Sequence, residues 1–403
     1  MCEKRRYSIR VELTHPTRIA TYEIKEVPNG TDQKLFIQNP KWEPFTLQLT
    51  EKRLPNVPGL LCGQLTFLSQ KLTKIELQHL LHVWLLAMFF PERFKTRPIL
   101  AAIGPKGSGK TTLIDQIGKI LFGSAFKVAQ LTDDPKDLDA ALTSEFFVAI
   151  DNADRNINWL PDKLAVIATG GTIKRRTYYT TNKLVEFPLK AWVGITSRTP
   201  HFKREDVADR LLPFHIQRIP EFAAFHDIEQ EVLQKHNLLL TALVRNVQIV
   251  LRHLSVKDTK RFQTTFRMVD YAYFVHLISY AMGFHGDVAN LLKRLAEEQL
   301  AFSIDGDHFF AAIAEWVTHY SGCEVTTGEL FKQLSQMTPA EMTDFRSAQA
   351  FWHKLEDSRV TLQKLYSMKT RSGHAGIKYV TFWHPDKKPR RGDDDDSPVS
   401  SAA

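Results

Sequence analysis

The first 60 residues alternate apolar and polar positions in short runs, such as Tyr7 to Leu13 and Lys34 to Ile37. A period of two is typical of strands that bury one face. Turn-forming residues interrupt these runs at Pro28-Asn29-Gly30 and at Asn39-Pro40. The pattern therefore predicts a small β-rich region over residues 1–65.

The pattern then changes to helical spacing between Lys74 and Phe90, where apolar positions recur every three or four residues and end before Pro91. Pro98 to Ile103 follows as a short apolar strand. From there to residue 220, strand and helix signals alternate, which is typical of a mainly parallel sheet covered by helices. We assign residues 66–220 to this α/β core.

Helical patterns dominate after Pro220, notably over Asp227 to Leu254 and Phe266 to Met282, which predicts a helical subdomain over 221–305. Residues 306–385 show three helices and then two expected strands, Lys364 to Met368 and Tyr379 to Trp383. This order favours a winged helix. The segregated charges of residues 386–403 predict a disordered tail.

Composition narrows the class of protein. Of 403 residues, 43% are hydrophobic and 24% charged, so a globular protein is expected and a fully disordered, collagen-like or coiled-coil chain is excluded. The most apolar run, Leu80 to Phe90, is too short to span a bilayer. No signal peptide opens the chain, and three widely spaced cysteines fit a reducing cytoplasm, so we predict a cytoplasmic protein without a membrane partner.

The clearest chemical motif follows the strand that ends at Ile103. Its sequence matches G-x-x-x-x-G-K-[ST] and opens the helical stretch Thr112 to Leu121. Such loops point backbone N–H groups at phosphate oxygens. Lys110 would reach the β- and γ-phosphates of ATP, and the Thr111 hydroxyl would bind Mg²⁺. The predicted phosphate-binding residues are Gly104, Pro105, Lys106, Gly107, Ser108, Gly109, Lys110, Thr111 and Thr112.

A second strand supplies the acidic residues that a nucleotide triphosphatase needs. Asp151 ends the apolar run that begins near Glu145, and it is the expected Mg²⁺-side carboxylate. Hydrolytic enzymes usually place a glutamate next, whereas this chain has Asn152, which can orient water but cannot accept its proton. Asp154 is the alternative base. Either residue could place the attacking water.

The next buried strand, Ala191 to Thr196, ends in Ser197-Arg198-Thr199-Pro200, polar groups that we expect where the γ-phosphate would lie. Thirteen residues after Ser197, Arg210 is expected on a short helix between strands. An arginine there can be presented to a neighbouring subunit's nucleotide, where it stabilises transition-state charge. An ordinary surface ion pair with Asp206 or Asp209 is the alternative.

This order of P-loop, acidic strand, basic segment, polar strand end and arginine resembles the AAA+ ATPases, and within them superfamily 3 helicases and the primase-helicase ATPases of phages, plasmids and integrative elements. The resemblance covers about residues 75–285, including Leu164 to Arg210 and Arg267 to Tyr271. It implies that Ser197 occupies the first sensor position, usually an asparagine, and that Arg210 is the arginine finger. It also implies a ring, most simply a hexamer.

A hairpin pattern lies between the acidic strand and the polar strand, over residues 173–188. By the same resemblance, this hairpin projects into the central channel and touches single-stranded or forked DNA through Lys174, Arg175, Arg176, Asn182 and Lys183. Residues 160–220 carry eleven Lys and Arg against five Asp and Glu, which favours phosphate binding by this segment. Ion pairs between subunits are the alternative use of these cations.

Two functional hypotheses follow. The first is a ring-forming, ATP-dependent DNA translocase or helicase of a mobile element. The second is an ATP-gated oligomeric DNA-binding scaffold that recruits an effector and does not unwind, which the substitution of Asn152 for glutamate favours. In the winged helix, Ser347 to Leu355 with Lys354 is the expected recognition helix, and contact with DNA or with a replication or effector protein are both open. Scattered histidines lack a third ligand, so no structural metal is expected.

Overall fold

The computed structural model describes residues 7–13, 22–28, 43–69, 71–154, 157–176, 184–220, 225–254 and 263–387. The chain forms two compact units, Met1–Ser303 and Ile304–Ala403. Each unit has its own hydrophobic core. The finer division that the sequence suggested, into residues 1–65, 66–220, 221–305, 306–385 and 386–403, stays a prediction.

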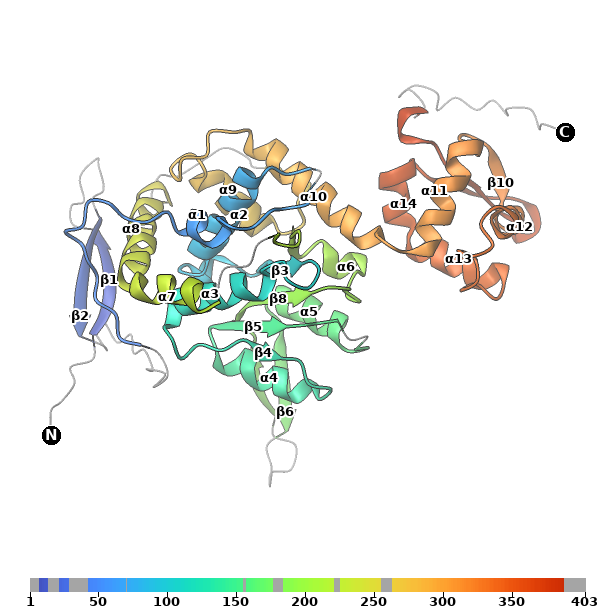
Figure 1. Cartoon of the computed structure of the whole chain (residues 1–403). Helices are drawn as coiled ribbons and strands as arrows, with labels where there is room; N and C mark the ends of the chain where they lie inside the picture. Colours follow the sequence, from blue (N-terminus) through green and yellow to red (C-terminus); the bar gives the residue numbers. More distant parts are fainter. Residues whose placement is uncertain are drawn as a thin grey trace. The chain divides into compact units, whose positions relative to one another are not determined.

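A five-stranded sheet organises the first unit (Figure 1). Its spatial order is β4-β5-β8-β3-β9, and each pair of neighbouring strands is parallel. The three central strands are almost wholly apolar and buried, as strands covered on both faces must be. The five strands are β3 (Ile99–Ile103), β4 (Ala129–Gln130), β5 (Phe147–Asp151), β8 (Trp192–Ser197) and β9 (Leu211–His215).

Helices follow and cover these strands. The helix after the P-loop, α3 (Lys110–Phe122), packs against β3, β5 and β8. The others around the sheet are α1 (Val57–Cys62), α2 (Lys74–Ala87), the 3₁₀ turn η2 (Pro91–Arg93), α4 (Pro135–Ser144), α5 (Leu160–Ala168) and α6 (Glu205–Ala208).

In helix α2, individual residues determine where the helix begins and attach it to the residue that precedes β3. Thr73 and Glu76 form a capping box at its start, which satisfies backbone donors that the helix leaves unpaired. Trp84 lies on its buried face and donates a hydrogen bond of 2.8 Å from Nε1 to the carbonyl oxygen of Pro98, just before β3. This helix therefore fixes the strand that leads into the P-loop.

The N-terminal region contains the predicted strand β1 (Tyr7–Leu13), which pairs antiparallel with β2 (Tyr22–Pro28). The second strand ends at Pro28, where the sequence placed a turn. The expected strand at Lys34 to Ile37 lies outside the described residues. Figure 1 shows this hairpin beside α8, which β2 contacts.

Helices complete the first unit after β9, as the sequence predicted. They are α7 (Phe225–Gln234), α8 (His236–Leu254), α9 (Val269–Ile278) and α10 (Val288–Ile304). The expected single helix from Asp227 to Leu254 is divided, because Lys235 separates α7 from α8.

The predicted hairpin between the acidic and polar strands is present. Strand β6 (Thr172–Arg176) pairs antiparallel with β7 (Leu184–Pro188) over five residues. The backbone N–H of Leu189 donates a hydrogen bond of 2.8 Å to the carbonyl oxygen of Gly171 and closes its base. Its connecting residues, 177–183, lie outside the described part of the chain.

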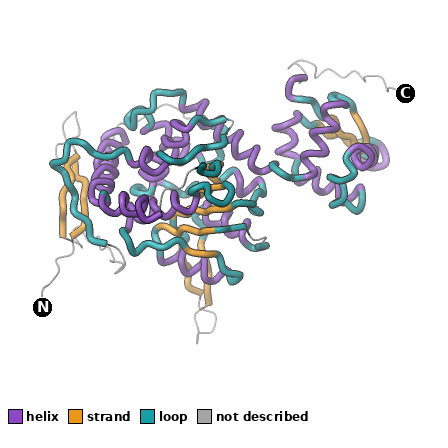
Figure 2. Tube along the Cα trace, in the orientation of Figure 1, coloured by secondary structure: helices purple, strands orange, loops and turns teal. Residues whose placement is uncertain are grey.

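The second unit combines helices with strands (Figure 2). The strands form a small antiparallel sheet in the order β10-β12-β11. The core of the unit includes Trp316, Phe351 and Phe382. The elements are α11 (His308–Tyr320), β10 (Glu324–Thr326), α12 (Thr327–Met337), α13 (Ala348–Asp357), α14 (Arg359–Tyr366), β11 (Lys369–Ser372), the 3₁₀ turn η3 (His374–Gly376), β12 (Lys378–Thr381) and the 3₁₀ turn η4 (Pro385–Lys387).

The prediction of a strand from Lys364 to Met368 in this unit is wrong. Residues 364–366 form the last turn of α14, and the strand begins only at Lys369. Thr361 and Leu362 are buried and Leu365 packs against the same core, a spacing that suits a helix and not a strand. The residues from 388 onward, which include most of the expected disordered tail, lie outside the described part of the chain.

Two histidines of α2, the buried His79 and the half-buried His82, make the stability of the first unit depend on pH. Nε2 of His79 lies 2.8 Å from Oγ of Ser279, and Nε2 of His82 lies 2.9 Å from Nδ2 of Asn246. Burial lowers the pKa of each ring to about 4. In the unfolded chain these two rings take up protons near pH 6.5. In the folded chain the same rings take up protons only near pH 4.

We therefore expect the free energy of unfolding to fall as pH decreases from 6.5 towards 4, by up to about 1.4 kcal/mol per pH unit for each histidine. Urea unfolding at pH 5 and pH 7.5 measures this slope. His82→Gln should flatten it, whereas His319→Gln, at a ring that is 55% exposed, should not. Equal slopes in both variants would contradict the assignment.

Candidate nucleotide site

The predicted site residues of the P-loop and the acidic strand lie at one edge of the parallel sheet. Strands β3, β5 and β8 run in the same direction, so their carboxyl ends meet there. Ile103 is in register with Ser197. The backbone N–H of Gly104 donates a hydrogen bond of 3.1 Å to the carbonyl oxygen of Ser197, so the P-loop leaves β3 directly beside the end of β8.

Glycine is required in this loop for two separate reasons. Gly107 and Gly109 have φ of 77° and 82°, a left-handed conformation that other residues adopt at a cost. Gly104 has no such φ, but a Cβ there would lie 2.2 Å from the carbonyl oxygen of Ile216. Gly109 then caps the start of α3, whose first backbone N–H groups point toward the loop.

Lys110 is buried at the start of α3, and its Nζ donates a hydrogen bond of 3.3 Å to the carbonyl oxygen of Pro105. Burial lowers the pKa of this amine, and the charge of Arg198 adds to the effect, against the opposing charges of Asp151 and Asp154. A phosphate oxygen is the kind of partner that would favour the charged amine here.

Thr111 and Asp151 are in direct contact, with 2.8 Å between Oγ1 and Oδ1. A hydroxyl and a carboxylate oxygen are ligands that suit Mg²⁺, which takes few protein ligands and completes its shell with phosphate and water oxygens. Ser108 adds a buried hydroxyl that has no hydrogen-bond partner among the described residues. These side chains therefore fit a metal-bound nucleotide.

Asn152 adopts a left-handed backbone conformation with φ of 53°. Its N–H donates a hydrogen bond of 3.0 Å to Oγ1 of Thr196, and its Nδ2 donates one of 3.1 Å to Oδ2 of Asp151. Positive φ in a residue other than glycine costs of the order of 1 kcal/mol and is most common at functional sites. Asn152 thus holds the carboxylate of Asp151 from one side.

Thr196 is a site residue that the sequence reasoning missed. It is fully buried at the end of β8, where its hydroxyl donates to Oδ1 of Asp151 while it accepts from Asn152. The available signal was a polar residue at the end of an apolar strand, but the pairing of β8 with β5, which brings Thr196 to Asp151, comes from the structure. A role was predicted for Ser197, the next residue, and none for Thr196.

Asp154 accepts hydrogen bonds from three consecutive residues of the neighbouring strand end. The donors are Oγ of Ser197 at 2.8 Å, the backbone N–H and Nε of Arg198, and the backbone N–H of Thr199 at 3.3 Å. Burial acts to raise the pKa of this carboxyl, but the hydrogen bonds outweigh it and hold the pKa below its ordinary value. A carboxylate held in this way is a weak proton acceptor.

Ser197 itself is fully buried, and its hydroxyl is used by Asp154. The structure therefore brings Lys110, Thr111, Asp151 and Asn152 together at the P-loop edge, and links Ser197 to the same edge through Asp154.

Arg210 lies at the amino ends of the parallel strands, whereas the P-loop lies at their carboxyl ends. Helix α6 ends at Ala208, so Arg210 is not on the helix as expected but just before β9, at its amino end. Its Nη1 donates to the carbonyl oxygen of Asp206 and lies 4.0 Å from that carboxylate. Burial lowers the pKa of Arg210, and the nearby charge of Arg267 adds to this. The five residues of β9 place about 16 Å between Arg210 and the P-loop edge.

The predicted DNA-binding residues are only partly described. Nζ of Lys174 on β6 pairs with Glu186 on β7 at 2.8 Å, with both side chains exposed, and this ion pair raises the pKa of Lys174. Arg175 and Arg176 lie on the same strand, but their side chains are outside the description. Asn182 and Lys183 lie outside the described residues.

Several other cations of residues 160–220 have acidic partners in the same chain, within 4.0 Å. These partnerships are Lys163 with Asp139, Lys190 with Glu92, Arg198 with Asp154, and Arg204 with Asp162 and Asp206. Internal ion pairs therefore take up part of the positive charge that the sequence suggested for DNA.

In the second unit, Lys354 on α13 is also engaged. Its Nζ lies 3.0 Å from the carboxylate of Asp307 and over the ring of Phe309. This cation thus fastens α13 to the start of α11.

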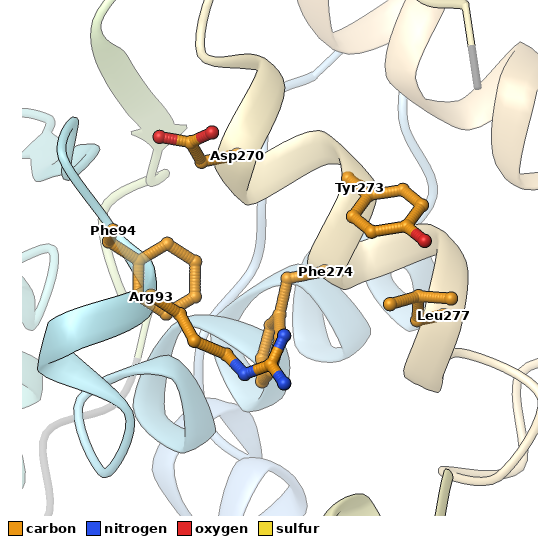
Figure 3. Close-up of a pocket in the computed structure, with 6 residues that line it drawn as sticks. All are labelled: Arg93, Phe94, Asp270, Tyr273, Phe274 and Leu277. Atoms are coloured by element: carbon orange, nitrogen blue, oxygen red, sulfur yellow. The ribbon is translucent and has the colours of Figure 1, made fainter. Parts of the chain in front are cut away.

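A small pocket lies apart from the P-loop, between η2 and α9 (Figure 3). Phe94 and Phe274 form its aromatic wall, with ring centroids 5.2 Å apart. In Figure 3, the Arg93 guanidinium and the Asp270 carboxylate lie at separate places around it. The lining residues are Arg93, Phe94, Asp270, Tyr273, Phe274 and Leu277, none of which the sequence predicted as a site.

The parallel sheet with a glycine-rich loop at its carboxyl edge defines an α/β protein with a P-loop sequence. A family model described as the actinomycete integrative conjugative element replication protein matches residues 64–293. The chain belongs to this family of replication proteins. No curated protein matches the chain.

Solved structures also resemble it at low identity. They include the apo C-terminal region of NrS-1 (14% identity, TM-score 0.42, covering 87% of this chain and 80% of that chain). A second is SCCmec type IV Cch, titled an active helicase (13%, 0.48, 92% and 78%). A third is a JCV helicase bound to a small molecule (11%, 0.28, 62% and 64%). Since these TM-scores are below 0.5, the family assignment rests on the family model.

Among the residues that the structure describes, no helix is both long and apolar enough to cross a membrane.

Gly104→Ala tests the geometry of the loop. The added methyl group would meet the carbonyl oxygen of Ile216, so the loop must shift, and we expect the affinity for Mg²⁺-ATP to fall by about a hundredfold. Isothermal titration calorimetry measures the change. Gly328→Ala in α12 is the matched control, because a Cβ there has no neighbour within 4 Å. Unchanged affinity in Gly104→Ala would contradict a binding role for this loop.

Proposed function

We propose that this chain is a ring-forming ATPase of the AAA+ class, close to superfamily 3 helicases, that moves on DNA during replication of an integrative element. One observation carries the proposal. Lys110, Thr111 and Asp151 meet at the carboxyl edge of the sheet, whereas Arg210 lies at the amino edge. The arginine is too far away to serve its own chain's P-loop and suits a neighbour's.

In this proposal, ATP and Mg²⁺ occupy the P-loop edge. Lys110 neutralises phosphate charge, Thr111 and Asp151 hold the metal, and Asn152 or Asp154 places the water. Mg²⁺ would supply the charge that draws electrons toward the phosphate oxygens. Phosphoryl transfer depends mainly on positioning and electrostatic stabilisation, so the absence of a glutamate after Asp151 is compatible with turnover.

Arg210 would be the arginine finger of the adjacent subunit's site. Its present contacts with Asp206 are not an obstacle, because a charge-assisted hydrogen bond to phosphate is stronger than one to a backbone carbonyl. Family membership supports a role in replication, and replication of an element requires work on DNA.

The β6–β7 hairpin would grip single-stranded or forked DNA in the central channel of a hexamer. Its cross-strand pairing gives a stiff base, closed by Leu189 and Gly171. The Lys174 to Glu186 ion pair is exposed, and exposed pairs contribute little to stability, so Lys174 can exchange its partner for a DNA phosphate. Arg175, Arg176, Asn182 and Lys183 belong to the same proposed contact.

The second unit would be a winged helix. Four helices precede the β11–β12 hairpin, which would be the wing, whereas the sequence predicted three helices and no strand at β10. Lys354 on the expected recognition helix is held by Asp307, and Glu356 and Asp357 end that helix. These acids repel phosphate, so we favour a replication or effector protein as the partner of α13.

The proposal predicts DNA-stimulated ATP hydrolysis that both Lys110→Ala and Arg210→Ala reduce, by about a thousandfold in the second case. Phosphate release with and without single-stranded DNA measures it, with light scattering to follow assembly. Lys110→Ala should prevent nucleotide binding, whereas Arg210→Ala should bind nucleotide normally.

Mixing Lys110→Ala protein with Arg210→Ala protein distinguishes a site built from two subunits from a site built from one. In a mixed ring, the intact P-loop of an Arg210→Ala subunit meets the intact arginine of a Lys110→Ala neighbour. Activity should therefore return on mixing. If the mixture stays inactive while it assembles, Arg210 is not a residue of the neighbour's site.

The second candidate is an ATP-gated scaffold that forms rings on DNA, recruits an effector and does not unwind. Asn152 and the hydrogen-bonded state of Asp154 favour it, because neither residue is a strong base. Slow hydrolysis suits a timed switch better than a motor.

Strand displacement distinguishes the two candidates. A forked DNA substrate, ATP and the assembled protein should yield free single strands at a rate that follows ATP hydrolysis if the first proposal holds. DNA binding and ATP-dependent assembly with no displaced strand would transfer the assignment to the scaffold. Lys110→Ala protein supplies the background rate.

A further inference from the structure

Arg198 directly follows β8, at the strand end whose polar groups the sequence predicts to lie near the γ-phosphate. The preceding residue, Ser197, is in register with Ile103 and accepts the hydrogen bond of Gly104 through its carbonyl oxygen. The backbone of Arg198 therefore begins one residue from the point where the P-loop leaves the sheet.

The two neighbouring side chains differ in what they can reach. Ser197 is fully buried, and its hydroxyl is committed to Asp154. The Arg198 side chain is 56% exposed. The polar group available at this strand end is therefore the guanidinium and not the hydroxyl.

The guanidinium is held by one side only. Its Nε donates a hydrogen bond of 3.0 Å to Oδ2 of Asp154, and its two Nη atoms have no partner among the described residues. Asp154 is fixed in turn by Ser197 and by the backbone N–H of Thr199. An arginine oriented through Nε presents its outer fork, a geometry that matches phosphate oxygens.

The charge of Arg198 also reaches Lys110, since it contributes to the lowered pKa of that amine. Two cations that repel each other at the end of a P-loop strand gain stability when an anion binds between them. The register of the strands places Arg198 at the same carboxyl edge of the sheet as the loop that precedes Lys110.

We propose that Arg198 binds the γ-phosphate of ATP in its own chain and so distinguishes ATP from ADP, while Asp154 acts as a positioning residue that orients the guanidinium. The inference rests on the proposed function, because it assumes that a nucleotide binds the P-loop. It assigns two arginines to one reaction site, with Arg198 from the same chain and Arg210 from its neighbour. Because Asp154 then orients Arg198, Asn152 is the residue that places the attacking water.

The test compares two nucleotides at a protein concentration where light scattering shows single chains. Calorimetric titration with Mg²⁺ and a non-hydrolysable ATP analogue, and separately with Mg²⁺ and ADP, gives two dissociation constants. For Arg198→Ala we expect the analogue to bind about tenfold more weakly and ADP to change less than about twofold. Arg198→Lys keeps the charge without the fork and should give an intermediate value.

Arg371→Ala is the matched control. Arg371 is also 56% exposed and also donates from Nε, at 3.0 Å, to a carboxylate, that of Glu324, but it belongs to the second compact unit. Neither dissociation constant should change in this variant. Circular dichroism of each variant verifies that it folds.

An equal loss of affinity for both nucleotides would overturn the proposal, since Arg198 would then only support the loop. Unchanged affinity for both would overturn it as well. An effect that appears only in the assembled ring would move Arg198 to the neighbour's site. If the wild-type chain binds neither nucleotide, the proposed function fails too, which separates that outcome from the failure of Arg198 alone.

Discussion

The parallel pairing of β5, β8 and β3 is the constraint on which the rest of the site depends. It brings the ends of three strands, far apart in the chain, to one edge of the sheet. The hydrogen bond between Gly104 and Ser197 fixes the loop against the polar strand end. A shift of this register by one residue would reverse the faces of every side chain on the strand and separate Thr111 from Asp151.

The two aspartates at this edge have different surroundings and, we propose, different uses. Asp151 contacts side chains that can yield to a cation, namely the Thr111 and Thr196 hydroxyls and the Asn152 amide. Asp154 instead receives backbone hydrogen bonds as well as the Arg198 guanidinium, so its carboxylate is fixed. Because hydrogen bonds to the charged form lower a pKa, those that Asp154 accepts hold the pKa of its carboxyl below the ordinary value.

The sheet also separates the two ends of the proposed reaction. A strand of five residues is long enough that Arg210 and Lys110 of one chain cannot meet on the same nucleotide. In the proposed function, a site divided in this way would be complete only between two copies of the chain, and hydrolysis would depend on assembly. The chain belongs to a replication-protein family, and its β6–β7 hairpin lies between β5 and β8 in the sequence.

The sequence by itself determined the P-loop, its flanking strand and helix, the acidic strand, and the β6–β7 hairpin, because each is a local pattern whose geometry the nearby residues fix. Local pattern failed at α14, where a few residues support either a helix or a strand until packing decides. Only the tertiary structure placed Thr196 on Asp151, committed Ser197 and Arg198 to Asp154, and put Arg210 at the opposite edge. These contacts join residues more than forty positions apart, or depend on which end of a strand a residue occupies, and strand order and register, which set them, are not written in any short stretch of sequence.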